Sequence, residues 1–437
     1  MSSETSSEEN SPLLKNSINT SGKVPVSDNE MGMIKPNEEP KVAGLFSSIS
    51  NLSNGCMGAG ILSLPFVFSG VGWALGIILL ILVGFLSWGS LQLLMIATTK
   101  AKIYEYEELA KYAWGKKFGI FMKCAIFGLT LSASTTYLII IGDSFPVVFK
   151  NFAATEHSIL TSRTFVCLIL MCFPIFPLMN MRKMDHLKFS SSLSFVSVCY
   201  IVLILIISFP SINLHFTSHP IYAFKWNYVG ILKGIPILIF SDSAHIVSLS
   251  VMKEFRNPNR KRITIASSST MILCNLMYFV ASFFGFFTFG ADVQGDVISG
   301  YPKDKLSIIF ARFVLSIGGI VSIPLFLFVA RASVNVLFFR NKPFSWVRNG
   351  LISLGLAVII SVLALTVPQI QLVADFCGAT FCVATIYIAP GFIYLKVCTK
   401  KGETKKKIIS WFYIIFGFCA MIVCTTMVII TKVLKKD

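Results

Sequence analysis

The stretch NLSNGCMGAGILSLP, residues Asn51–Pro65, places three glycines inside the first long apolar segment of the chain. Glycine allows backbone geometries and close contacts that larger side chains forbid. In hydrocarbon, a helix that loses its internal hydrogen bonds must recover them from protein, water or a bound solute. The stretch therefore predicts a broken helix at membrane depth, next to a wet cavity.

The composition identifies a polytopic membrane protein. Of 437 residues, 54% are hydrophobic and 14% charged, and the mean hydropathy is +0.74, whereas soluble domains carry roughly 25% charged residues. Apolar runs of about 20 residues, each enough to cross a bilayer as a helix, recur from Lys41 to Ile430. We predict an all-α protein with eleven spans: about Lys41–Phe68, Val71–Ile96, Phe118–Ile141, Thr164–Leu178, Phe189–Pro210, Tyr228–Val251, Ile263–Phe289, Leu306–Phe338, Val347–Thr366, Ile370–Leu395 and Ile408–Ile430.

The chain divides into a polar tail and a transmembrane domain. Residues 1–40 are rich in Ser, Glu, Asn and Pro and cannot bury enough apolar surface to fold, so we expect a disordered cytosolic tail. We expect residues 41–437 to form the transmembrane domain. The tail segment Glu9–Leu14 (ENSPLL) fits an acidic dileucine sorting signal for a sorting adaptor, so a lysosome, vacuole or endosome is an alternative address to the plasma membrane.

The net charge of +17 would indicate nucleic acid in a soluble protein. Here the Lys and Arg residues cluster in short loops after the even-numbered spans, for instance around Arg340, Lys342 and Arg348. This pattern favours membrane topology over nucleic-acid binding and predicts a cytosolic amino terminus. Walker A, zinc-protease and nucleophile-elbow motifs are missing from the sequence, so we expect neither an enzyme nor a cofactor other than a coupling ion.

The break in the first span predicts two kinds of ligand group. The amides of Gly58, Ala59 and Gly60 would head the half-helix that follows and suit an anionic carboxylate. The carbonyls near Asn54 and Met57 end the preceding half-helix and suit a cation. The alternative is that the small residues serve helix packing alone.

A second interrupted segment, GIPILIFSDSAH at Gly234–His245, lies in the sixth span. A charged side chain there costs at least about 2.5–3.5 kcal/mol on insertion scales and usually faces a cavity or a partner. We expect Asp242 to bind a proton or Na⁺, with His245 as a coupling or gating residue. Alternatively, the two pair and make the bundle rigid. In the eighth span, Ser322 could complete an oxygen cage for Na⁺.

These segments resemble the amino acid/auxin permease family, and most closely its sodium-coupled neutral amino acid transporter branch. The resemblance extends over nearly all of Lys41–Ile430. It implies a leucine-transporter fold of two inverted five-helix repeats, about 41–210 and 228–395, plus an extra helix at about 408–430. It also implies that Phe240, Ser241 and Ser243 line the substrate site. Two departures, Ile320 where the branch often has a hydroxyl and Asp242 where it has an apolar residue, favour proton coupling.

We therefore expect a secondary active transporter of neutral amino acids that works by alternating access in the lipid bilayer, coupled to H⁺ or Na⁺. One alternative is a non-transporting amino acid sensor in an endolysosomal membrane, which would bind its ligand without flux. The other is an auxin-like organic anion carrier.

Overall fold

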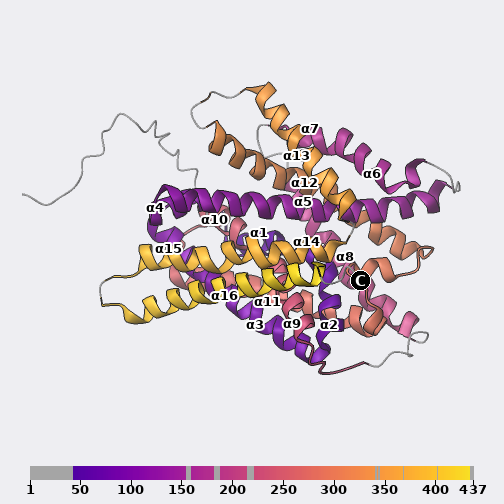
Figure 1. The fold of residues 1–437 in the computed structure, drawn as a ribbon, viewed down its shortest axis with the longest axis horizontal. Coiled ribbons are helices and arrows are strands. Elements are labelled where there is room, and N and C mark those ends of the chain that lie inside the picture. Colours follow the sequence, from indigo (N-terminus) through magenta and orange to yellow (C-terminus); the bar gives the residue numbers. More distant parts are fainter. Residues whose placement is uncertain are drawn as a thin grey trace, which may run out of the picture. The chain divides into compact units, whose positions relative to one another are not determined.

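The computed structural model describes residues 43–153, 159–181, 188–213, 221–339, 342, 345–367, 369–400 and 402–433. From Lys41 onward the chain forms one compact unit, and its described elements are helices apart from one isolated bridge. The predicted tail and the Glu9–Leu14 sorting signal lie outside the described residues. Figure 1 shows long helices running side by side.

Apolar runs of the predicted length form the helices of the first half. The broken first span comprises α1, η1 and α2. The bounds are α1 Leu45–Cys56, η1 Ala59–Ser63, α2 Leu64–Val71, α3 Trp73–Ala101, α4 Tyr106–Trp114, α5 Lys116–Ala153, η2 Ile159–Thr161, α6 Arg163–Leu170, η3 Met171–Ile175, α7 Phe176–Met179 and α8 Lys188–Asn213.

The second half also contains long and interrupted helices. Its elements are α9 Tyr228–Ser241, α10 His245–Glu254, α11 Arg260–Phe289, η5 Gly290–Asp292, η6 Val297–Gly300, α12 Leu306–Phe338, α13 Trp346–Thr366, α14 Ile370–Cys377, η7 Gly378–Cys382, η8 Ala384–Ile388, α15 Ala389–Cys398 and α16 Thr404–Val433.

Within the described residues, eight helices are long and apolar enough to cross a membrane, and the bent pair formed by α1 and η1–α2 makes up to nine. Two further apolar helices, Arg163–Met179 and Phe195–Phe209, are shorter. The structure thus confirms an all-helical chain with many membrane-spanning helices, while the count of eleven stays a prediction.

The predicted end of the third span at Ile141 is wrong, because α5 continues to Ala153 and keeps Pro146 inside it. The apolar run resumes after Asp143, and Arg163 lies 3.3 Å from that carboxylate. The ion pair lowers the cost of a charge within a long helix.

Two of the predicted spans contain π-helical turns. Met171–Ile175 is π-helical around Pro174, which lacks the amide needed for an α-helical hydrogen bond. The tenth span holds two such segments, η7 and η8. Gly378 in η7 packs against the backbone of the sixth span: an added Cβ would lie 1.9 Å from the Pro236 carbonyl. Single-turn π segments often mark functional sites.

The two interrupted spans are joined at one end. The amide of Ala43, ahead of α1, donates to the Glu254 carbonyl at the end of α10 (3.1 Å), and the amide of Arg256 donates to the Ala43 carbonyl (3.0 Å). These bonds form the isolated bridge between Ala43 and Phe255. They couple the start of the first span to the end of the sixth.

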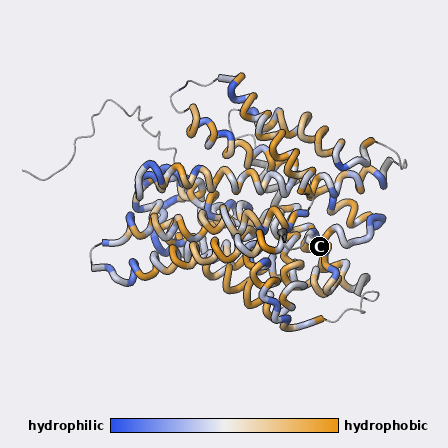
Figure 2. The backbone as a smooth tube through the Cα atoms, viewed as in Figure 1, coloured by the Kyte–Doolittle hydropathy of each residue, from blue (hydrophilic) through white to orange (hydrophobic). Residues whose placement is uncertain are grey.

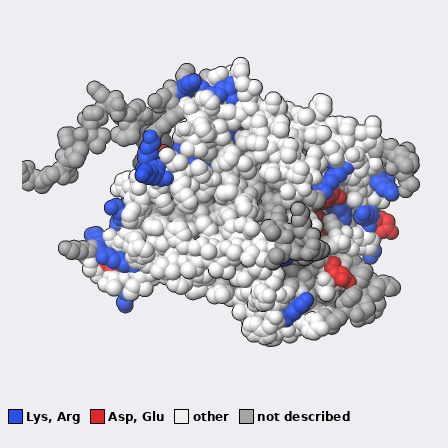
Figure 3. All heavy atoms as spheres, viewed as in Figure 1, with Lys and Arg blue, Asp and Glu red and all other residues white. Residues whose placement is uncertain are grey.

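Polarity follows the helix axes. Figure 2 shows hydrophobic residues along most of each helix and hydrophilic residues near the helix ends. In Figure 3, the end with α4 and the α15–α16 connection carries mainly Lys and Arg, whereas the opposite end mixes both charges. Such a distribution is typical of a membrane-spanning bundle.

Candidate functional site

The first span is broken where the sequence predicts. Helix α1 ends at Cys56, Met57 and Gly58 are extended, and η1 begins at Ala59. The helices on the two sides are bent by 51°. The amide of Met57 donates to the Ser53 carbonyl (2.8 Å), which closes the end of α1.

The sixth span is interrupted more mildly. Helix α9 ends at Ser241, and α10 begins at His245. In the turn between them, the Ala244 amide donates to the Asp242 carbonyl (2.9 Å). Tyr228–Glu254 therefore still counts as one span, so this break is a short turn rather than a sharp bend.

The two breaks meet at Gly60. An added Cβ at Gly60 would lie 2.5 Å from the Ser241 hydroxyl oxygen, 3.2 Å from the Ser241 Cα and 3.3 Å from the Phe240 ring. A larger residue would have to displace the Ser241 hydroxyl and would crowd the Ser241 backbone, so a glycine suits this approach. The structure thus brings three of the predicted site residues together.

A tyrosine that the sequence interpretation missed joins the two breaks. The Tyr278 hydroxyl of α11 lies 2.7 Å from the Ser241 carbonyl and 3.1 Å from the Cys56 carbonyl, and it donates to these last residues of α9 and α1. The Cys56 thiol also donates to the Ser241 carbonyl (3.5 Å). A polar aromatic residue in the middle of an apolar span was the available signal.

A second tyrosine joins the first break to the eighth span. The Tyr137 hydroxyl of α5 interacts with the Ser322 side chain and with the backbone of Ala59. A cavity of about 10 Å³, lined among others by Gly58, Ala59 and Tyr137, lies there. It has room for about one water molecule. The site is closed in this conformation.

Asp242 is a buried carboxylate in the site. Its side chain is 1% exposed, and within the described residues neither carboxylate oxygen makes a hydrogen bond. The Ser87 hydroxyl lies near the Asp242 carboxylate. The hydrogen bond that Ser87 makes, however, is with the Tyr387 hydroxyl (3.0 Å). A buried carboxylate in this state needs a proton or a cation.

Asp242 and His245 do not pair, so the alternative that they merely brace each other is wrong for this conformation. His245 Nε2 bonds to the Ser90 hydroxyl (2.8 Å) on α3. Its other ring nitrogen, Nδ1, is buried and has no hydrogen-bond partner among the described residues. Both residues thus face α3 rather than each other.

The remaining predicted site residues are placed less favourably for binding a substrate or an ion. Ser243 donates to the carbonyl of Phe240 (2.9 Å) and so folds back on its own turn. Asn54 has a buried side-chain oxygen without a partner in the described part of the chain, and Met57 is 1% exposed within the apolar core. No group of three or more His, Cys, Asp or Glu side chains able to hold a metal ion occurs among the described residues.

A bundle with a bent first span, an interrupted sixth span and a small closed site between them has the architecture of a membrane transporter. Residues 41–430 match the family of transmembrane amino acid transporter proteins. The chain belongs to this family, and it is a multi-pass integral membrane protein rather than an enzyme.

Comparison with individual proteins confirms the resemblance. The chain is similar to the sodium-coupled neutral amino acid symporter 2 of Danio rerio, with 26% identity over 91% of this chain and 84% of the relative. It is also similar in fold to MhsT, whose crystal structure was solved in complex with L-phenylalanine. The TM-score is 0.57 and the identity 12%, over 89% of this chain and 99% of MhsT. The fold is therefore leucine-transporter-like.

Proposed function

We propose that this chain is a secondary active transporter of neutral amino acids that works by alternating access and is coupled to H⁺ or Na⁺. The observation that carries the proposal is the meeting of the two interrupted spans, with Gly60 against Ser241 and Tyr278 bonded to the carbonyls of Cys56 and Ser241. Main-chain groups exposed at such breaks are suited to bind zwitterionic substrates.

The amides of Gly58, Ala59 and Gly60 would bind the substrate carboxylate. They stand at the start of the helical segment Ala59–Val71, where unsatisfied amides and the positive end of the helix dipole favour an anion. Phe240, Ser241 and Ser243 would line the opposite side. The name of the relative from Danio rerio supports neutral side chains.

The closed site supports alternating access. A cavity of about 10 Å³ holds one water molecule and not an amino acid, so the site must open before a substrate binds. The joined ends of α1 and α10, at Ala43 and Phe255, would move together when it opens. A rigid-body movement around a site near the bilayer midplane is the usual mechanism of inverted-repeat transporters.

Two observations bear on the coupling ion. The buried and unpaired Asp242 supports H⁺, and Ile320 replaces a hydroxyl that would help to hold Na⁺. The relative is sodium-coupled by name, which supports Na⁺ at oxygens of Asn54, Met57 and Ser322. His245 would act as a gate through its bond to Ser90.

The finer topology belongs to the same proposal. It comprises eleven spans with repeats at about 41–210 and 228–395 and an extra helix at 408–430. The amino terminus would be cytosolic, with a sorting adaptor bound at Glu9–Leu14. The two short apolar helices, Arg163–Met179 and Phe195–Phe209, would be the fourth and fifth spans.

The test is uptake of a panel of neutral amino acids into proteoliposomes that contain the full chain, with pH and Na⁺ gradients imposed separately. We expect accumulation above the external concentration under one of the two gradients, and the gradient that drives it identifies the ion. Measured binding without accumulation under either gradient would make the protein a sensor. Accumulation of organic anions but of no amino acid would make it an anion carrier.

A further inference from the structure

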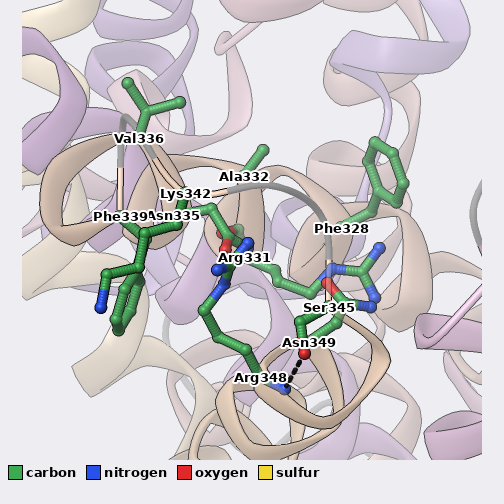
Figure 4. Close-up of a pocket in the computed structure, with 10 residues that line it drawn as sticks. All are labelled: Phe328, Arg331, Ala332, Asn335, Val336, Phe339, Lys342, Ser345, Arg348 and Asn349. Carbon is green, nitrogen blue, oxygen red and sulfur yellow. Dashed lines mark hydrogen bonds between the residues drawn. The ribbon is translucent and has the colours of Figure 1, made fainter.

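Asp242 lines neither of two cavities in the described part of the chain. One, of about 410 Å³, lies between the end of α12 and the start of α13, and side chains of both helices surround it (Figure 4). The other, of about 10 Å³, lies beside Gly58 and Ala59. Because Asp242 borders neither cavity, the groups nearest to its charge are those of the protein packed around it.

Helix α3 presents two serines to the turn that interrupts the sixth span. Ser90 Oγ lies 2.8 Å from His245 Nε2, and the Ser87 hydroxyl lies near the Asp242 carboxylate. Residues three apart on a helix share one face, and the two serines have the same spacing as Asp242 and His245. Both serines are fully buried. The serine face of α3 and the polar turn of the sixth span therefore meet in register.

The bond to Ser90 determines where His245 carries its hydrogen. The Ser90 hydroxyl donates its single hydrogen to the Ser87 carbonyl (3.1 Å), so its oxygen can only accept from His245 Nε2. In the neutral imidazole the other nitrogen, Nδ1, then has no hydrogen. His245 in this form cannot donate to Asp242 from Nδ1.

Other polar neighbours of Asp242 use their hydrogens elsewhere. Tyr278 and Cys274 of α11 both lie close enough to interact with the Asp242 charge. The Tyr278 hydroxyl donates to the carbonyls that end α1 and α9. The Cys274 thiol donates to the Ser53 carbonyl (3.9 Å). Neither group has a hydrogen left for the carboxylate.

Ser87 differs from these neighbours, because its hydroxyl faces another hydroxyl. Ser87 Oγ lies 3.0 Å from the Tyr387 hydroxyl oxygen of η8, and either group can be the donor. When Tyr387 donates, the hydrogen of Ser87 is free to turn toward Asp242. When Ser87 donates, its hydrogen is used by Tyr387. The pair can change between these two directions by rotating hydroxyl hydrogens.

The ring of Tyr387 is fixed by the last helix. It stacks on the ring of Tyr413, with centres 6.3 Å apart and planes at 12°, and it meets the ring of Phe416 edge to face at 5.2 Å. Both partners belong to α16, and the Tyr387 side chain is fully buried. Ring packing therefore holds the Tyr387 hydroxyl at Ser87, and replacement by Phe would keep these ring contacts.

We propose that Ser87 and Tyr387 are positioning residues of the coupling site that stabilise Asp242 when no ion is bound to it. The inference rests on the proposed function, in which Asp242 binds and releases the coupling ion. Without the ion, Tyr387 donates to Ser87 and Ser87 donates to the carboxylate. With the ion bound, Ser87 turns and donates to Tyr387.

This exchange of partners matters for one part of a transport cycle. Accumulation of substrate requires the empty protein to return across the membrane with Asp242 free of its ion. A buried carboxylate in that state is costly unless it accepts hydrogen bonds. Without the Ser87 hydroxyl the ion-free form would be less stable, so the ion would bind more tightly and leave more slowly.

The experiment compares net uptake with exchange in proteoliposomes that contain the full chain. Net uptake of an amino acid that the wild type accumulates is measured while the H⁺ and Na⁺ concentrations are varied one at a time. Exchange of the same amino acid is measured with both ions saturating and equal on the two sides. Net uptake requires the ion-free protein to return, whereas exchange does not.

We expect Ser87→Ala to lower the half-saturating concentration of the coupling ion roughly 10- to 100-fold, because the ion-free form loses a hydrogen bond to a charged group. Its maximal rate of net uptake should fall about tenfold or more for the same reason, since ion release becomes slow. Exchange should stay close to that of the wild type. A role in packing alone would not lower the half-saturating concentration while preserving exchange.

A second variant, Tyr387→Phe, removes only the hydroxyl. We expect a shift in the same direction of about two- to fivefold, because a charged acceptor strengthens each bond of a chain by a fraction of its energy. Tyr413→Phe is the matched control, since it removes a hydroxyl from the neighbouring stacked ring, and it should leave both values unchanged. If Ser87→Ala lacks exchange as well, the comparison of these two variants decides.

Three results would overturn this inference alone. A raised half-saturating concentration in Ser87→Ala would make Ser87 a ligand of the ion instead. Wild-type values in Tyr387→Phe would exclude its hydroxyl from the site. An equal shift in Tyr413→Phe and Tyr387→Phe would indicate an effect of packing. A wild type without net uptake under either gradient would refute the proposed function and this inference together.

Discussion

At the scale of single residues, the site depends on small groups that permit close contact and on polar groups that lack partners. Gly60 allows the first span to touch the sixth at Ser241. Tyr278 then donates to the carbonyls of Cys56 and Ser241 at this contact. Asp242 has no such partner in the described part of the chain, so it is the residue on which an ion would act.

We expect Gly60→Ala to abolish transport, because its Cβ would lie 3.2 Å from the Ser241 Cα and 2.5 Å from its hydroxyl. Separating the breaks would cost about 1–3 kcal/mol of stability, measurable as a lowered melting temperature. Gly355→Ala is the matched control, since nothing lies within 4 Å of an added Cβ there. Normal uptake by Gly60→Ala would show that the close contact is not needed.

We expect Asp242→Asn to bind substrate but to lose accumulation driven by the coupling gradient. The amide keeps the size of the side chain but cannot carry the charge that a proton or cation neutralises. Uptake under separate pH and Na⁺ gradients measures this. The control is Asp304→Asn, which changes an exposed carboxylate in a connection between helices. Gradient-driven accumulation equal to wild type would remove Asp242 from coupling.

At the scale of elements, the sequence predicts the long helices and the two interrupted spans, but not the π-helical turns. The span at Leu306–Phe338 agrees with α12, because an apolar run of that length has no alternative in hydrocarbon. The glycines of the first span also located its break. The interruption of the sixth span was predicted at Gly234–His245, where α9 ends and α10 begins, although its small bend was not. The π turns of the tenth span were not predicted, since they depend on neighbouring helices.

Contacts between elements could not be predicted either, because they also depend on how distant helices pack. Tyr278 and Cys56 are 222 residues apart, and a single sequence does not show which of many intramembrane hydroxyls meets a broken helix. Likewise, Tyr137 was not distinguished from the other polar residues of α5. The Tyr137 hydroxyl interacts with both Ser322 and the backbone of Ala59, while the role of Ser322 in holding Na⁺ stays a prediction.

The connection between α11 and α12 gives a prediction for pH. Asp296 accepts from the Ile298 amide (3.0 Å) and the Ser299 hydroxyl (2.9 Å). Burial raises the pKa of the Asp296 carboxyl above its ordinary 3.8, and the opposing effects of Arg312 and these hydrogen bonds do not cancel the rise. The folded state therefore holds the proton more tightly than the unfolded state.

The free energy of unfolding should consequently fall as the pH rises from about 4 through the raised pKa of Asp296. Asp296→Asn should lose this part of the pH dependence, as measured by melting temperature across pH 4 to 7. Asp304→Asn should retain it. Parallel curves for wild type and Asp296→Asn would assign the pH dependence to other groups.

At the scale of the whole molecule, the family and the fold support one mechanism. A leucine-transporter-like bundle places two interrupted spans face to face, and α1 and α10 are joined at their ends. The closed cavity beside Ala59 would then be one state of a cycle that opens to each side in turn.

The most direct test is an experimental structure of the full chain with a transported amino acid bound. We predict that its carboxylate lies within hydrogen-bonding distance of the amides of Gly58, Ala59 and Gly60, with Phe240 and Ser241 on the opposite side. An amino acid bound elsewhere, with these amides bonded only to protein, would contradict the account.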